Sequence, residues 1–400
     1  MRTPALMAKQ KKNTSADTYT LHSDVRVLRG GKEYFSQIQH IASIAQQTLH
    51  LQTYIFDDDE TGQEVALALI AAASRGVHVY VMVDGYASQK LSDTFVKKLQ
   101  DGGVNFRYFM PLLHSKYYYL GRRMHHKIIV ADATIVMIAG VNISNRYNDM
   151  PDAPAWLDWA IVAQGPVAEN INNLCEQMWN KTVFAAKCIP HIGNYNNKAG
   201  SILVRMRRND WVFRKTDITK TYLELFATAR YNVTIMTSYF WPPHRLLRNM
   251  EEAARRGVKI KLVLTGNADV PLSKYAERYL YNRLFRSGIE VYEYLPNVLH
   301  GKLGICDGEW ATVGSYNLND ISAFASIELN LDVKDKVLVN KLKVTVEDII
   351  AQDCKLISKS GYGFYGNVLK KLLYYLSYRI IHILFFLFTF YYAQHKKRNQ

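Results

Sequence analysis

The stretch HHKIIVADATIVMIAGVN at residues 125–142 decides the fold, because a second stretch, HGKLGICDGEWATVGSYN at residues 300–317, has the same pattern. In each, a histidine is followed two residues later by lysine, then by an aspartate and an asparagine at the same intervals. The identical spacing indicates a duplicated unit and argues against chance. The members of the two sets are His125, Lys127, Asp132 and Asn142, and His300, Lys302, Asp307 and Asn317.

Each motif reads as a β-hairpin. Residues two apart on a strand point to the same face, so each motif presents an imidazole and an ammonium together. The apolar run breaks at Asp132 in the first motif and at Asp307-Gly308 in the second. A turn at these points would bring each asparagine back beside its His-x-Lys pair.

A longer repeat surrounds the motifs. Residues 54–85 and 237–266 each read as strand, helix and strand, with Arg75-Gly76-Val77 and Arg256-Gly257-Val258 at the same place. Glycine after a helix followed by a β-branched strand predicts parallel strands with helical crossovers, and hence the α/β class. We expect a polar N-terminal extension (1–22), a first repeat (23–190), a linker (191–201), a second repeat (202–336) and an appended helical C-terminal segment (337–400).

The charge and the apolar stretches of the sequence indicate which kinds of partner the protein binds. A net charge of +15 in 400 residues predicts attraction to nucleic acid or anionic lipid. Residues 372–393 are apolar and aromatic with cations on both sides, but the uninterrupted apolar part after Arg379 is shorter than the ~20 residues that span a bilayer. We expect an interfacial anchor, with a buried C-terminal helix as the alternative. Residues 1–13 lack the apolar core of a secretory signal, and four separated cysteines predict neither a zinc site nor a disulfide framework.

The motif residues suit chemistry on a phosphodiester, and we expect the catalytic residues to be His125, Lys127, Asp132, His300, Lys302 and Asp307, with Asn142 and Asn317 in support. Imidazole can act near neutral pH as nucleophile or as proton carrier, and two histidines can divide these roles. Lysine and asparagine donors can neutralise the non-bridging oxygens, so no metal or cofactor is expected. Adjacent His125 and His126 lack the spacing of a helical zinc pair. A third His-x-Lys at residues 114–116 lacks the aspartate, and we interpret it as unrelated.

With these motifs the sequence resembles the phospholipase D superfamily, whose hallmark is two HxKx4D motifs, each followed by a Gly/Ser-rich turn and an asparagine. Ser315 matches the turn of the second motif, whereas the first has Ala139-Gly140 there. The resemblance implies two α/β/α sandwich repeats with mixed sheets, packed face to face about a pseudo-twofold axis. It also implies that acidic residues at Asp158 and Glu328 orient the motif histidines by hydrogen bonds.

Within the superfamily the chain is similar to bacterial cardiolipin synthases over roughly residues 25–335. The similarity lies in Tyr54 and its acidic run, both Arg-Gly-Val turns, LVLTG at 262–266, WATVGSYNLN at 310–319 and IELN at 327–330. The N-terminus lacks the two transmembrane helices of the long synthases, so the chain is closer to the short class.

The resemblance implies a cardiolipin synthase that transfers a phosphatidyl group between phospholipids through a phosphohistidine. By family analogy His125 is the nucleophile, and phosphatidylglycerol is the expected donor and acceptor. The predicted partner is an anionic phospholipid membrane, contacted peripherally or through a C-terminal anchor on its cytoplasmic side, and we do not expect nucleic acid to bind. The alternatives are a phospholipid hydrolase, a nuclease of the same superfamily and a non-enzymatic binding protein; no motif residue is lost, which argues against the last.

Overall fold

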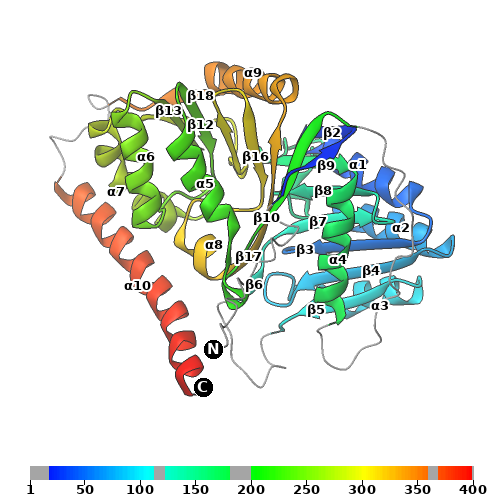
Figure 1. The fold of residues 1–400 in the computed structure, drawn as a ribbon. Helices are drawn as coiled ribbons and strands as arrows, with labels where there is room; N and C mark the ends of the chain where they lie inside the picture. Colours follow the sequence, from blue (N-terminus) through cyan, green and yellow to red (C-terminus); the bar gives the residue numbers. More distant parts are fainter. Residues whose placement is uncertain (1–17, 112–121, 181–199, 359–367, 399–400) are drawn as a thin grey trace, which may run out of the picture.

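The computed structural model describes residues 18–111, 122–180, 200–358 and 368–398. Two mixed β-sheets form the centre of the molecule, and helices pack on both faces of each sheet (Figure 1). Most of the predicted linker (191–199) and the third His-x-Lys (114–116) lie outside the described residues.

The first sheet has seven strands in the order β2-β9-β8-β7-β3-β4-β5. Helices of the first half lie on both of its faces. The strands are β2 (Asp24–Arg29), β3 (Thr48–Thr53), β4 (His78–Asp84), β5 (Asn105–Phe109), β7 (Lys127–Ala131), β8 (Ile135–Ala139) and β9 (Trp159–Gln164), and the helices are α1 (Lys32–Ile44), α2 (Glu60–Ser74), α3 (Asp93–Asp101) and α4 (Pro166–Asn180).

The second sheet repeats this order as β10-β17-β16-β15-β12-β13-β14. Its equivalent strands are β10 (Ile202–Asp210), β12 (Asn232–Met236), β13 (Lys259–Thr265), β14 (Glu290–Tyr294), β15 (Leu303–Cys306), β16 (Trp310–Gly314) and β17 (Ser326–Lys334). Its helices are α5 (Asp217–Thr228), α6 (His244–Arg255), α7 (Pro271–Arg286), the short α8 (Asp320–Phe324) and α9 (Lys336–Asp353). The matching strand order confirms the predicted duplication.

Strands buried on both faces explain the unbroken apolar runs of the motifs. In β7, Ile128 and Val130 face the core shared by the two sheets, whereas Ile129 and Ala131 face α1, α2 and α3. The shared core also contains Leu303 and Ile305 of β15 together with side chains of α4 and α9. The two sheets therefore pack face to face, as predicted.

Two short strands from the N-terminal part of the chain pair with strands of the second sheet. β6 (Arg123–Met124), which immediately precedes the first motif, pairs with β17 of the second half. β1 (Thr20–His22) pairs with β10, and a bridge joins Leu157 to Leu299. Short β11 (Lys215–Thr216) and β18 (Cys354–Leu356) complete the second sheet. The starts of both motifs are thus held where the two halves meet, a contact that we call the seam.

The C-terminal region differs from the expectation of an appended segment beginning at residue 337. α9 follows β17 as α4 follows β9, and its buried residues Val339, Leu342, Val346, Ile349 and Ile350 lie in the shared core. The second repeat therefore includes α9, because this helix covers a sheet face that would otherwise be exposed.

The last helix, α10 (Val368–Arg398), runs along the outside of the second half (Figure 1). It packs on α7 through tyrosines: the ring centroids of Tyr275 and Tyr374 are 5.9 Å apart, and those of Tyr279 and Tyr378 are 4.8 Å apart. Among the described residues, no helix combines the length and apolar character needed to cross a bilayer.

Candidate active site

Both motif histidines lie where a strand begins at the seam between the halves. The backbone N–H of His125 donates to the carbonyl of Ile327 on β17, at 3.0 Å. The backbone N–H of His300 donates to the carbonyl of Leu157 in the first half, at 2.7 Å. Each histidine is therefore anchored to the other repeat.

Each motif histidine also lies next to a carboxylate from the other half. Nδ1 of His125, in the first half, lies 2.9 Å from Glu328 of the second. Nδ1 of His300, in the second half, lies 2.6 Å from Asp158 of the first. Both carboxylates are completely buried. A carboxylate that accepts from Nδ1–H fixes the tautomer and ring orientation and leaves Nε2 for chemistry.

The two histidines line one cavity of about 470 Å³. Asn142 and Asn317 line it too, so each repeat contributes a histidine and an asparagine. The halves thus bring these four predicted site residues to a single cavity.

Two buried lysines add positive charge behind the histidines. Lys127 and Lys302 are 1% and 0% exposed, and each ammonium donates to the backbone carbonyl of the histidine two residues before it. Burial, together with the charge of Lys302, lowers the pKa of Lys127 to about 7. Burial likewise lowers the pKa of Lys302. Two cations held together out of water favour an anion between them.

Burial also shifts the pKa values of the two motif histidines and of Asp158. It lowers the pKa of His125, while the negative charge of Glu328 opposes this shift. Burial and the charge of Lys302 hold the pKa of His300 well below its usual value. Burial raises the pKa of the Asp158 carboxyl to about 6. Burial therefore favours the neutral form of both imidazoles before substrate binds.

The supporting polar residues differ between the halves. Asn142 accepts from the N–H of Ile55 at 3.2 Å and donates to the hydroxyl of Tyr147 at 2.9 Å. In contrast, the buried Oδ1 of Asn317 has no hydrogen-bond partner among the described residues. Ser315 donates to Glu328 at 2.5 Å, so it supports the carboxylate that holds His125.

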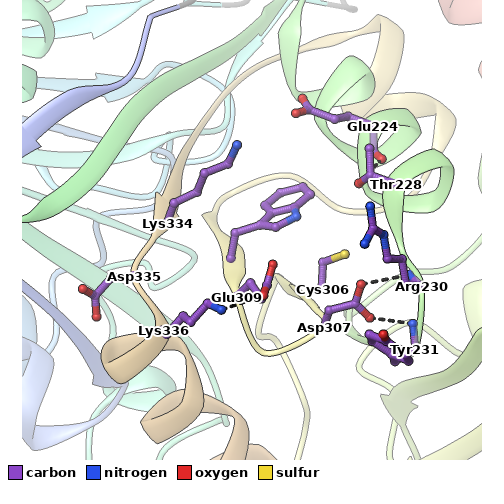
Figure 2. A pocket seen from close by; sticks show the side chains of 11 residues that line it. Glu224, Thr228, Arg230, Tyr231, Cys306, Asp307, Glu309, Lys334, Asp335 and Lys336 are labelled. Carbon is purple, nitrogen blue, oxygen red and sulfur yellow. Dashed lines mark hydrogen bonds and ion pairs between the residues drawn. The ribbon is translucent and has the colours of Figure 1, made fainter.

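The predicted catalytic role of Asp132 and Asp307 requires correction. Asp132 accepts from the backbone N–H groups of residues 46–48, and Asp307 from those of residues 230–232, all within 2.7–2.9 Å. Figure 2 shows Asp307 bonded to the backbone of Arg230 and Tyr231. Each aspartate follows its lysine by five positions, which along an extended strand is about 16 Å. These carboxylates fasten the hairpin turn, where Asp132 and Asp307 adopt positive φ.

Aromatic residues beside the histidines were not singled out from the sequence, apart from Tyr54. The ring of Tyr54 packs edge-on against His125 at 4.9 Å, and Tyr147 against His300 at 5.1 Å. Trp156 lies 6.0 Å from His300. Tyr147 follows Asn142 by five residues, but the equivalent residue of the second repeat is Ser322, so the repeat gave no signal for it. Within the described ranges, no group of three His, Cys, Asp or Glu side chains converges on a metal-binding point.

Comparison with known proteins matches this geometry. The sequence profile of the family described as "Cardiolipin synthase, PLD-like domain" matches residues 38–179 and 222–350, one segment in each half. The chain belongs to this family. The predicted resemblance is confirmed, and the chain is a phosphatidyltransferase of the phospholipase D superfamily.

Relatives that match over most of their length support the same assignment. Cardiolipin synthase B of Escherichia coli (strain K12) is 34% identical over 348 residues, which cover 84% of this chain and 82% of that protein. Cardiolipin synthase B of Salmonella typhimurium is 35% identical over 350 residues, covering 84% and 83%. The two matched family segments each contain one of the His-x-Lys pairs.

A solved structure confirms the fold alone. The phosphatidylserine synthase of Haemophilus influenzae Rd KW20 superposes with a TM-score of 0.71 at 15% identity, covering 94% of this chain and 97% of that one. Both halves and their relative placement are therefore found in a solved phospholipase D-like protein.

Proposed function

We propose that the chain condenses two molecules of phosphatidylglycerol into cardiolipin and glycerol. The observation that carries the proposal is the crossed pairing: Glu328 of one half holds His125 of the other, and Asp158 holds His300. This pairing places two oriented imidazoles from different repeats on one cavity. The 34–35% identity to cardiolipin synthase B supports the lipid substrate.

In the first step, Nε2 of His125 attacks the phosphorus of the donor. The N–P bond forms as the P–O bond to glycerol breaks, giving a phosphatidyl-histidine. His125 suits this role because its ring is the more exposed of the two, whereas the ammonium of Lys302 lies 3.3 Å from Nε2 of His300. Lys127 and Lys302 neutralise the non-bridging oxygens.

His300 supplies the proton for the departing glycerol. A bound phosphodiester anion raises the pKa of a neighbouring imidazole and so counters the depressed pKa of His300. In the second step the neutral ring takes the proton from a hydroxyl of the acceptor. That oxygen attacks phosphorus, the N–P bond breaks, and His125 is regenerated. The unpaired Oδ1 of Asn317 offers an acceptor for a substrate hydroxyl.

Contact with the membrane follows from charge and from α10. The chain carries a net charge of +15, and α10 exposes Leu372, Leu373, Leu376 and Ile380. We expect peripheral attachment on the cytoplasmic side, where each cation near an anionic surface contributes about 1 kcal/mol. Co-sedimentation with phosphatidylglycerol vesicles should weaken as salt rises; salt-independent binding equal to that on neutral vesicles would contradict this attachment.

Product analysis tests the function. The purified full chain, incubated with phosphatidylglycerol vesicles, should form cardiolipin and glycerol in equal amounts by mass spectrometry. Phosphatidic acid as the main product would show a hydrolase, and cleavage of single-stranded DNA without lipid turnover would show a nuclease. Either result would overturn the proposal.

A further inference from the structure

The catalytic cavity continues beyond the histidines into an apolar region. Besides the motif residues, it is lined by six apolar side chains on its side toward α7, α8 and α10, which we call the apolar arm: Val270, Leu272, Ile321, Ile381, Leu384 and Phe385. Val270 and Leu272 come from the start of α7, Ile321 from α8, and the other three from α10. One cavity thus has a polar end and an apolar end.

Several of these side chains remain partly uncovered within the protein. Val270, Ile321 and Leu384 are each 43–44% exposed, whereas Ile381 is packed against Trp241. Apolar surface left open beside a polar catalytic centre is stabilised when an apolar ligand covers it. The headgroup of a phosphodiester does not supply such a group.

Side-chain contacts with α7 and α8 fix the position of α10 beside the cavity. The tyrosine pairs with α7 hold its first turns. Further along, Phe385 lies 6.1 Å from Phe324 of α8, and His382 lies 3.5 Å from Asp320. These contacts place successive turns of α10 against α7 and then α8, so the helix lines one side of the cavity.

We propose that the apolar arm receives an acyl chain of a substrate phospholipid and that α10 forms the outer wall of this chain site. The inference rests on the proposed function, since it assumes a lipid substrate with its phosphate at His125 and His300. Both ends belong to one cavity, so a lipid whose phosphate is at the histidines can lay a chain along Ile321 and Leu384. α10 then selects substrate in addition to any contact with the membrane.

Adjacent residues of α10 give a matched pair of variants. Leu384 lines the cavity, whereas Ile383 does not; both are apolar and exposed, at 43% and 53%. Leu384→Asp and Ile383→Asp should weaken vesicle binding alike. Only Leu384→Asp places a carboxylate in the chain site.

The measurement is kcat/KM for phosphatidylglycerols of increasing chain length, presented in detergent micelles at constant surface concentration. For the wild type, kcat/KM should rise with chain length, by at most about fourfold per methylene covered. Leu384→Asp should flatten this dependence, losing about tenfold on the dioleoyl lipid and little on the dihexanoyl lipid. Ile383→Asp should keep the wild-type slope.

A second pair avoids introduced charge. Leu384→Trp should fill the arm and shift the preference toward shorter chains, and Ile383→Trp should not. Equal slopes for all four variants and the wild type would overturn the chain site. Equal losses in both Asp variants at every chain length would overturn it as well, leaving α10 a membrane contact alone. Failure of the proposed function would look different, because the wild type would then transfer no lipid of any length.

Discussion

Each half of the active site pairs a histidine with a carboxylate, but the two carboxylates accept different hydrogen bonds. In one pair His125 faces Glu328, which also accepts hydrogen bonds from Ser315 at 2.5 Å and Ser322 at 2.7 Å. In the other pair His300 faces Asp158, which accepts from the N–H of Trp159 at 2.8 Å and lies 3.7 Å from the ammonium of Lys302.

Gly140 explains part of this difference. It occupies the position equivalent to Ser315, and a Cβ there would lie 2.2 Å from Oδ1 of Asp158. A serine would therefore displace the carboxylate that holds His300. The departure of the first motif from the Gly-Ser pattern is thus coupled to the carboxylate packed against it. Duplication supplied two equal frameworks, and local changes gave the two histidines different surroundings.

Removing either imidazole should have the largest effect and should separate the two roles. We expect His125→Ala and His300→Ala each to lower the steady-state transfer rate by about 10⁴-fold or more. With radiolabelled phosphatidylglycerol, His125→Ala should trap no acid-labile phosphoenzyme, whereas His300→Ala should still label slowly. Labelling of His125→Ala at the wild-type rate would reverse the assignment of the nucleophile.

Exchanging the residues that distinguish the halves should have the next largest effect. Gly140→Ser should move Asp158 and lower kcat by about 10²-fold, because misplacing a catalytic group by about 1 Å costs that much. The reverse exchange, Ser315→Gly, removes one hydrogen bond to Glu328 and should lower kcat by about tenfold. Gly140→Ala adds the same Cβ without the hydroxyl, so the steric argument predicts a comparable loss. Wild-type activity in Gly140→Ser would contradict the steric argument.

The pH dependence of kcat/KM should show one limb from the Asp158 carboxyl and one from the Lys127 ammonium. Below about pH 6, the Asp158 carboxyl takes up a proton and no longer holds His300, so kcat/KM should fall about tenfold per pH unit. Above about pH 7, free enzyme loses the charge of Lys127, and kcat/KM should fall again. Asp158→Asn should abolish the acid limb and keep the alkaline one. An unchanged acid limb in Asp158→Asn would assign that titration to another group.

The turn aspartates should affect activity least. Asp132→Ala leaves three backbone N–H groups without their acceptor, so it should lower the free energy of unfolding by about 2 kcal/mol, as measured by urea denaturation. Asp307→Ala should do the same, and in each folded variant kcat should stay within a few-fold of wild type. Asp132→Asn retains one acceptor oxygen and is the milder control. Loss of kcat without loss of stability would restore a catalytic role for these residues.

The sequence was sufficient for features that depend on local pattern. The spacing of the two motifs predicted both hairpins, and the two Arg-Gly-Val turns predicted the crossover helices. The same spacing predicted a catalytic role for Asp132 and Asp307, because pattern alone does not distinguish a residue that reacts from one that fastens a turn.

The sequence did not predict which residues meet across the contact between the two halves. Asp158 and Glu328 were selected as orienting carboxylates, but nothing in a linear pattern tells which histidine each one reaches. The crossing arises because β6 of the first half pairs with β17 of the second. α9 was expected to be an appendage because its sequence shares no recognisable motif with that of α4. The two helices nevertheless occupy equivalent places in the two halves.

The crossed pairing is tested most directly by proton NMR of the imidazole N–H groups in the full chain. Two low-field Nδ1–H resonances are expected, assigned by their loss in His125→Ala and His300→Ala. Glu328→Gln should remove or shift the His125 resonance and spare that of His300, and Asp158→Asn should do the opposite. If each carboxylate variant instead perturbs the histidine of its own repeat, the two halves do not complete one another's site and the account fails.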